Sequence, residues 1–216
     1  EIVFHLAYAH LLLGQPAEAL SMIEAGRQRG VPEDELTARV ELEALCDLHR
    51  QSDAVARFAD RIEQLPDEAR VIYGQACLVA NNAEMLAAAY CAQLSQPDTD
   101  GSRKATRILR HMHWELLLRH EQHEVVRGEL AHLGITPQTS SISDGVFAAR
   151  AYAGDEAMRQ AFEDRVAELA PQSSDLLDLS MASQWMLHAR RYHDAIAMLE
   201  RILPRDSFSP LHVDLL

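Results

Sequence analysis

The segment from Arg103 to His120 is the part of the chain whose side chains could do chemistry. It reads RKATRILRHMHWELLLRH, with five Lys or Arg residues and a single acidic residue, in a chain of 33 acidic and 20 basic residues. Arg107, Arg110 and Trp114 are three and four residues apart, so they share one face of a helix. Two guanidinium groups beside an indole can bind a carboxylate and stack on an apolar side chain. The pattern predicts a site for an acidic peptide.

An alternative gives the same residues a structural role. In that case Trp114 belongs to the hydrophobic core, and the arginines pair with acidic side chains of neighbouring helices, such as Glu84 or Glu124. Both interpretations fit the spacing, and the sequence leaves both open.

Histidines at 111, 113, 120 and 123 raise the question of a metal site. A helical zinc motif needs His-Glu-x-x-His, and HEQHE at 120–124 has one residue too few between its histidines. The acidic stretch DTDGS at 98–102 places its glycine too early for a calcium loop, and no acidic ligand stands at the twelfth position. We therefore expect no metal site and no cofactor.

Motifs of catalysis are missing from the sequence as well. No glycine-rich phosphate loop follows a strand pattern, and no G-x-S-x-G element is present. Serine, histidine and aspartate are plentiful, but their spacing does not orient them towards one another. We expect no catalytic residues, and a chain that is not itself an enzyme.

Charge and composition exclude two classes of partner. The formal net charge of −13 repels nucleic acids and anionic lipid surfaces, so we expect no nucleic-acid partner. The uncharged apolar stretches are far shorter than the roughly 18–20 residues that cross a bilayer, so we expect no membrane insertion. Cys46, Cys77 and Cys91 lie within apolar helical patterns, where cysteine acts as a small hydrophobe. This slightly favours a cytoplasmic location, and a periplasmic one stays open.

Hydrophobic periodicity and turn signals predict helices along the whole chain. Polar or glycine-containing turns recur at intervals of 31 to 39 residues, and each separates an apolar run from an amphipathic run. They begin at Gly14, Arg50, Asn81, His120, Gly154 and Arg190. Proline residues, which end helices, mark the connections between successive pairs.

These signals predict an all-α chain of twelve helices, each about 11 to 16 residues long, arranged as six antiparallel hairpins. The hairpins are expected at 1–30, 35–65, 67–96, 102–134, 143–170 and 174–204, with the start of a further helix at 209–216. We expect a single domain over 1–216. The first residues already have the pattern of a helix interior, so we expect an excerpt of a longer protein.

The two terminal hairpins resemble the tetratricopeptide repeat. In the stretch 6–26, small residues stand where that family has them, namely at Ala7, Gly14, Ala19 and Gly26. In the stretch 181–203, the comparable places are held by Ala182, Tyr192 and Ala195. Small residues let two helices approach closely. The middle hairpins depart from the pattern, with Val55, Leu86 and Val125 where alanine is expected.

The resemblance implies a right-handed superhelix of about six hairpins, an α-solenoid whose first helices line a concave groove. The groove residues it implies are Tyr8, Leu12, Asp47, Gln75, Arg107, Arg110, Trp114, Tyr152 and Gln184. Such a groove holds a peptide or a partner domain, so we expect a non-catalytic scaffold for protein–protein interaction. Proteins of bacterial secretion or exopolysaccharide export are settings that the family implies.

Two further expectations follow from the repeat. Similar repeats precede glycosyltransferase, sulfotransferase and methyltransferase domains, so an accessory module that positions substrate in a larger enzyme is the alternative function. Terminal hairpins of a repeat array also expose apolar faces that normally stack on neighbours. Leu6, Leu13 and Leu211 are candidates for self-association through such faces.

Overall fold

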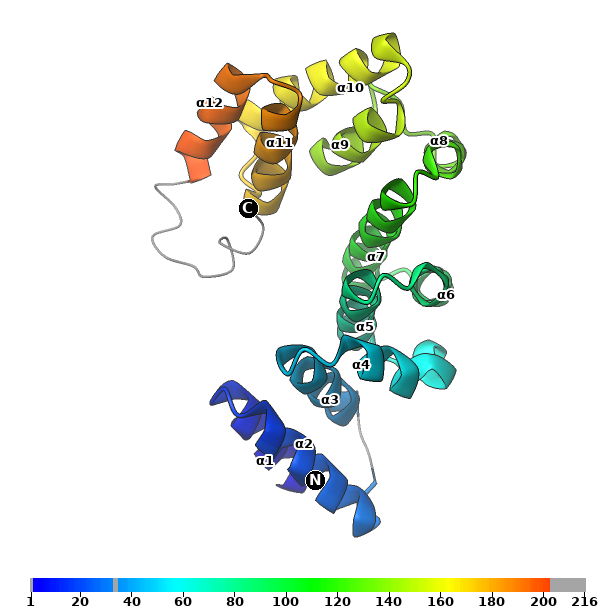
Figure 1. The fold of residues 1–216 in the computed structure, drawn as a ribbon, viewed down its shortest axis with the longest axis vertical. Coiled ribbons are helices and arrows are strands. Elements are labelled where there is room, and N and C mark those ends of the chain that lie inside the picture. The colour runs from blue at the N-terminus through cyan, green and yellow to red at the C-terminus, as the bar shows by residue number, and fades with distance from the viewer. Residues whose placement is uncertain (1, 33–34, 203–216) are drawn as a thin grey trace. The chain divides into compact units, whose positions relative to one another are not determined.

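The computed structural model describes residues 2–32 and 35–202, and this part of the chain is all helical (Figure 1). It contains twelve α-helices, two short 3-10 segments and no strand, which confirms the all-α class. The further helix expected at 209–216 lies outside the described residues, as does Leu211.

The chain divides into two compact units, at residues 1–116 and 117–216, and each is described by itself. The first unit holds α1 (Ile2–Leu12), α2 (Pro16–Gln28), α3 (Glu35–Asp47), α4 (Gln51–Phe58), η1 (Ala59–Gln64), α5 (Asp67–Val79), α6 (Ala83–Leu94) and most of α7 (Asp100–Arg119). The second unit holds the end of α7, then α8 (His123–His132), α9 (Ile142–Ala151), α10 (Glu156–Leu169), η2 (Ala170–Gln172), α11 (Leu176–His188) and α12 (Tyr192–Ile202).

Five of the connections within helix pairs use the same three-residue turn. The middle residue of each turn, called the turn residue below, has a positive φ. The turn residues are Gly14 (70°), His49 (56°), Asn81 (55°), Glu121 (58°) and Arg190 (59°). The amide after each turn residue donates to the carbonyl five residues before it, at 2.8–2.9 Å. This bond closes the helix end as a Schellman motif and lets the next helix begin at once.

The connection between α9 and α10 is different. It has four residues, Tyr152–Asp155, and none of them has a positive φ. Asp155 caps α10 instead, because its carboxylate accepts from the Met158 amide at 3.1 Å.

Counting from the turn residue gives these five pairs the same frame. Five residues after it, the second helix places a side chain that is 0% exposed: Ala19, Ala54, Leu86, Val126 and Ala195. Seven residues before it, the first helix places another buried residue: Ala7, Leu42, Gly74, Trp114 and Ser183. The alignment on Val55 and Val125 was therefore wrong by one residue, and Val125 is 46% exposed.

Packing between pairs follows one pattern inside each unit. In the first unit, α3 packs on both α1 and α2, and α5 packs on both α3 and α4. In the second unit, α11 packs on both α9 and α10. At Gly74 of α5, an added Cβ would come within 2.4 Å of Leu109 of α7, so glycine is what lets these two helices approach.

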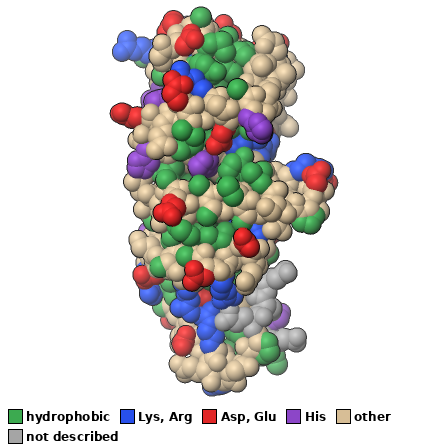
Figure 2. Space-filling view, turned by 90° about the vertical axis from the view of Figure 1, so that its right-hand side faces the viewer, with side chains coloured by type: hydrophobic (Ala, Val, Ile, Leu, Met, Phe, Trp, Pro, Cys, Tyr) green, Lys and Arg blue, Asp and Glu red, His purple; other side chains and the backbone are tan. Residues whose placement is uncertain are grey.

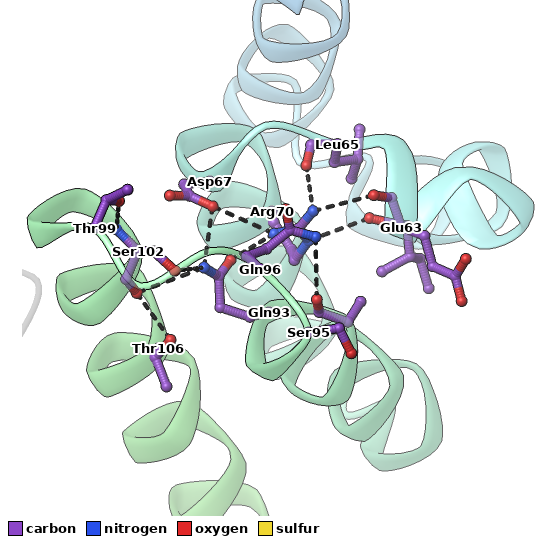
Figure 3. Close-up of polar contacts among 12 residues, drawn as sticks. Glu63, Leu65, Asp67, Arg70, Gln93, Ser95, Gln96, Thr99, Ser102 and Thr106 are labelled. Carbon is purple, nitrogen blue, oxygen red and sulfur yellow. Dashed lines mark hydrogen bonds and ion pairs between the residues drawn. The ribbon is translucent and has the colours of Figure 1, made fainter.

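Four helices differ in length from the 11 to 16 residues expected. The helices α8 and α9 have 10 residues each, α7 has 20, and α4 has 8, because the chain continues as the 3-10 segment η1. The guanidinium of Arg70, which is 1% exposed, accounts for η1 (Figure 3). It donates to the carbonyls of Ile62, Glu63 and Leu65, so a side chain holds the end of η1 in addition to the backbone bond from the Leu65 amide to the Ile62 carbonyl.

The same guanidinium joins three further elements. Arg70 donates to Oε1 of Gln93 on α6 at 2.6 Å, and Gln93 donates to Asp67 at 3.0 Å and to Oγ of Ser102 on α7 at 3.1 Å (Figure 3). Burial lowers the pKa of Arg70, and the Asp67 carboxylate opposes that shift. The network therefore links η1, α5, α6 and α7.

A second buried charge joins α2, α3 and α4. The Glu41 carboxylate is 2% exposed and accepts from Arg27 of α2 at 2.8 Å and from Arg57 of α4 at 2.5 Å. These two ion pairs place the Glu41 carboxylate in the contact between the first and the second helix pair.

We predict that His49→Gly stabilises the chain by about 0.5–1 kcal/mol, because glycine takes a positive φ without the Cβ clash that histidine suffers. The control is Arg50→Gly at the next position, where φ is −106°, so glycine relieves no strain there, adds unfolded-state entropy and removes the exposed pair with Asp53. Thermal unfolding followed by circular dichroism measures both. A lower midpoint for His49→Gly than for the native chain would contradict the strain at the turn.

We also predict that Arg70→Met destabilises the chain by about 3 kcal/mol, since it leaves buried carbonyls and the Gln93 amide without a donor. Arg103→Met is the control, because Arg103 is an exposed arginine that pairs with Asp98 and Asp100 in solvent. Urea unfolding of both variants should show the larger loss at Arg70. Equal losses would show that the buried network adds nothing.

Candidate partner-binding face

The predicted groove residues separate into two sets on the structure. Tyr8, Gln75 and Gln184 each lie six residues before a turn residue, and the first unit adds Glu43 and Glu115 at the same place. All five of these side chains are exposed or half-buried. Leu12 and Asp47, two residues before a turn residue, are exposed as well. The positions six and two residues before a turn residue therefore lie on an outward face of the first helices.

Arg107, Arg110 and Trp114 lie elsewhere on α7. Trp114 is 0% exposed, and the Arg110 guanidinium lies over its ring at 5.0 Å from the centroid. The His111 ring is 5.8 Å from the same indole. The indole is thus part of the interior and cannot stack on a bound peptide, which corrects the predicted clamp. Arg107 is exposed.

Tyr152 is not on an outward row either. It follows the last residue of α9, and its ring stacks on Phe162 of α10 at 5.8 Å between centroids. The Arg127 guanidinium lies 5.6 Å from the same ring. These contacts give Tyr152 a packing role between helices.

In the first unit, the outward face of α1, α3 and α5 carries a polar cluster. Arg39 of α3 donates from Nε to Glu43 at 2.8 Å and from Nη1 to Glu68 of α5. The hydrogen bond with Glu43 holds the pKa of Arg39 above its ordinary value against the opposing effect of burial, and Glu68 and the Tyr8 phenol act in the same direction. Residues of three successive first helices thus come together on this face.

Tyr8 and Gln75 were predicted from the sequence, whereas Arg39, Glu43 and Glu68 were missed because they have the types of ordinary surface residues. The signal that could have found the cluster is the frame of the turn residues, because Tyr8, Glu43 and Gln75 all stand six residues before one. We name the outward side of α1, α3 and α5, marked by Tyr8, Arg39, Glu43, Glu68 and Gln75, the first-helix face.

A hollow of about 450 Å³ lies on the other layer of the first unit, between η1 and α6. Its lining includes the small residues Ala88 and Ala92, the carboxylates Asp60 and Glu63, and Cys91.

One side of the molecule, seen in space filling, has hydrophobic patches separated by acidic, basic and histidine side chains (Figure 2).

Within 2–32 and 35–202, no group of three or more His, Cys, Asp or Glu side chains is placed to hold a metal ion. No helix in that part of the chain is both long enough and apolar enough to span a bilayer.

The three thiols differ in environment. Cys77 is buried and Cys46 is half-buried, as expected for small hydrophobes, whereas Cys91 is exposed. Burial raises the pKa of Cys46 to about 11 and that of Cys77 to about 12.

No family model and no curated protein matches this chain.

We predict that a neutral maleimide at pH 8 modifies Cys91 first, because the other two thiols are shielded and stay protonated. Burial raises the pKa of the Cys77 thiol from 9.0 to about 12. The buried, protonated thiol therefore stabilises the folded chain fully below pH 9, and this stabilisation is lost as the pH rises towards 12. Mass spectrometry of labelled peptides gives the order of reaction. Labelling of Cys77 before Cys91 would contradict the burial described, and Cys91→Ser is the control for background labelling.

Proposed function

We propose that this chain is a tetratricopeptide-like repeat module that binds a protein or peptide partner along its first helices and performs no chemistry itself. The observation that carries the proposal is the shared turn, with a positive φ and the same bond to the carbonyl five residues earlier in five of six helix pairs. Each such turn sets one first helix and one second helix in the same frame. Further pairs stacked in that frame would build a right-handed superhelix with a concave face.

The packing pattern supports the same proposal. In the repeat proposed, each first helix packs on both helices of the pair before it, and α3, α5 and α11 make these contacts inside their units. Small residues at Ala7, Ala19 and Ala195 are 0% exposed, which is where close approach of helices needs them.

The first-helix face is the proposed binding surface. Packed helices lie about 8–10 Å apart, so Tyr8 on α1 and Gln75 on α5, with α3 between them, are separated by about 20 Å. An extended segment of about six residues covers that length. Tyr8 offers a ring and a hydroxyl, and Gln75 offers an amide that can donate to and accept from a peptide backbone.

Charge gives the partner a preferred chemistry. Glu43, Asp47 and Glu68 outnumber Arg39 on this face, and Arg39 already binds two of these carboxylates. A peptide with basic side chains is therefore the better match here. The acidic peptide expected from the sequence is matched instead to Lys104 and Arg107, which are exposed on α7.

The test is selection of binders from an unbiased peptide display library on the immobilised chain. Selected peptides should bind Tyr8→Ala/Gln75→Ala about tenfold more weakly than the native chain, which corresponds to about 1.4 kcal/mol. The matched control is Tyr192→Ala/Gln28→Ala, which makes the same two substitutions at exposed positions of second helices. The control should bind as the native chain does.

Two results would overturn the proposal. The first is a library that gives no binders above the background of an unrelated immobilised protein. The second is a set of binders that the face variant retains in full. Binders lost only with Lys104→Glu/Arg107→Glu would move the site to α7 and also reject the first-helix face.

A further inference from the structure

The guanidinium of Arg39 lies between carboxylates of two successive first helices. Its Nε donates to Oε1 of Glu43 on α3 at 2.8 Å, and its Nη1 donates to Oε2 of Glu68 on α5. A guanidinium is planar and can donate to two carboxylates at once. Glu43 and Glu68 are therefore placed so that one guanidinium joins them on the first-helix face.

The phenol of Tyr8 on α1 lies close enough to act on the same guanidinium. The hydrogen bond with Glu43 is the largest influence that raises the pKa of Arg39, and Glu68 and the Tyr8 phenol add to it. An aromatic ring also attracts a cation placed over its face. Three first helices thus contribute groups that favour a cation at this one place, namely carboxylates from α3 and α5 and a phenol from α1.

The negative charge on this part of the face exceeds the positive charge of Arg39. Asp47 is exposed four residues after Glu43 on α3, so it adds a third carboxylate to the face. The formal net charge of the whole chain is −13, which acts in the same direction. A cationic side chain of a partner is therefore attracted to the place that Arg39 holds in the free chain.

The ion pairs of Arg39 are weak enough to exchange. The side chains are 37% exposed for Arg39, 27% for Glu43 and 73% for Glu68. Water and salt compete for ion pairs this exposed, so each contributes little to stability. Glu41 on the same helix is the contrast, because its carboxylate is 2% exposed and its two ion pairs join neighbouring helices. Arg39 can leave its partners without disturbing the packing of α3.

We propose, on the basis of the proposed function, that Arg39 is a displaceable internal ligand of the first-helix face. An arginine of the partner peptide takes its place between Glu43 and Glu68. On binding, the Arg39 guanidinium moves into solvent, and the partner's guanidinium donates to the same two carboxylates. Arg39 therefore lowers the affinity of the face for every peptide that binds these carboxylates, and it favours those that carry an arginine.

The alternative is that Arg39 itself binds a carboxylate of the partner. Its guanidinium already donates to Glu43 and Glu68, which a partner's carboxylate would have to displace. These two side chains and Asp47 would then repel the incoming carboxylate, with no added cation to balance them. The two possibilities predict opposite effects of removing Arg39, because direct contact makes Arg39 necessary and displacement makes it a competitor.

Fluorescence anisotropy with the tightest peptide that display selection on the native chain yields tests the proposal. The peptide should contain an arginine. Arg39→Gln should bind it about fivefold more tightly than the native chain does, because no internal guanidinium has to be displaced. In the citrulline analogue of the peptide, a neutral urea replaces the guanidinium. This analogue should bind the native chain about tenfold more weakly and should gain nothing from Arg39→Gln.

Arg103→Gln is the matched control. Arg103 is exposed on α7, pairs with Asp98 and Asp100, and its loss changes the net charge by the same amount. This variant should bind the peptide as the native chain does. Arg39→Ala introduces no new amide and should show the same gain as Arg39→Gln. Thermal unfolding checks that all three variants are folded.

Three results would overturn the displacement of Arg39. They are an affinity of Arg39→Gln and Arg39→Ala no higher than that of the native chain, a tightest peptide without arginine, and an equal gain in Arg103→Gln. If Tyr8→Ala/Gln75→Ala still weakens that peptide, the first-helix face keeps its proposed function. A library without binders would overturn both proposals.

Discussion

The structure depends on a backbone constraint at the helix-pair turns. One residue in the left-handed region, with the bond from the next amide to the carbonyl five residues earlier, ends a helix and starts another within three residues. A turn this short leaves almost no freedom in how the second helix packs on the first. Buried positions can therefore be counted from the turn residue, and the count holds across pairs whose sequences differ.

Buried charges then join one pair to the next. Glu41 is held by Arg27 and Arg57 from the helices on either side of α3, and Arg70 binds the carbonyls at the end of η1. A buried ion of this kind is costly if a partner is lost, and it contributes more to a defined arrangement than to net stability. Contacts that demand one geometry define how α3 packs on its neighbours and how η1, α5, α6 and α7 meet in the first unit.

The existence and order of the helices could be predicted from the sequence, because proline and glycine mark their ends and apolar residues recur at the helical period. The exact position of each turn residue, from which the buried positions are counted, could not be predicted. Glycine is typical of a positive φ at position 14, but His49 and Glu121 adopt it without any signature in residue type. The residues given for these two turns, Arg50 and His120, therefore each lie one position from the turn residue. Of the two interpretations of Trp114, the groove residue fails and the core residue holds, since seven residues before Glu121 is a buried position. The buried roles of Arg70 and Glu41 were equally hidden, because a charged residue is ordinarily a surface residue.

Residue-resolved amide hydrogen exchange at Arg50, Asn82, Gln122 and Arg191 tests the central claim, which is that one turn is repeated along the chain. These amides follow the non-glycine turn residues and donate to carbonyls five residues earlier, so all four should be protected although they lie in connections between helices. Protection should fall at Gly154, in the connection that lacks the motif. Exchange at the four amides as fast as in an unstructured peptide would contradict the shared turn, and the repeat built on it.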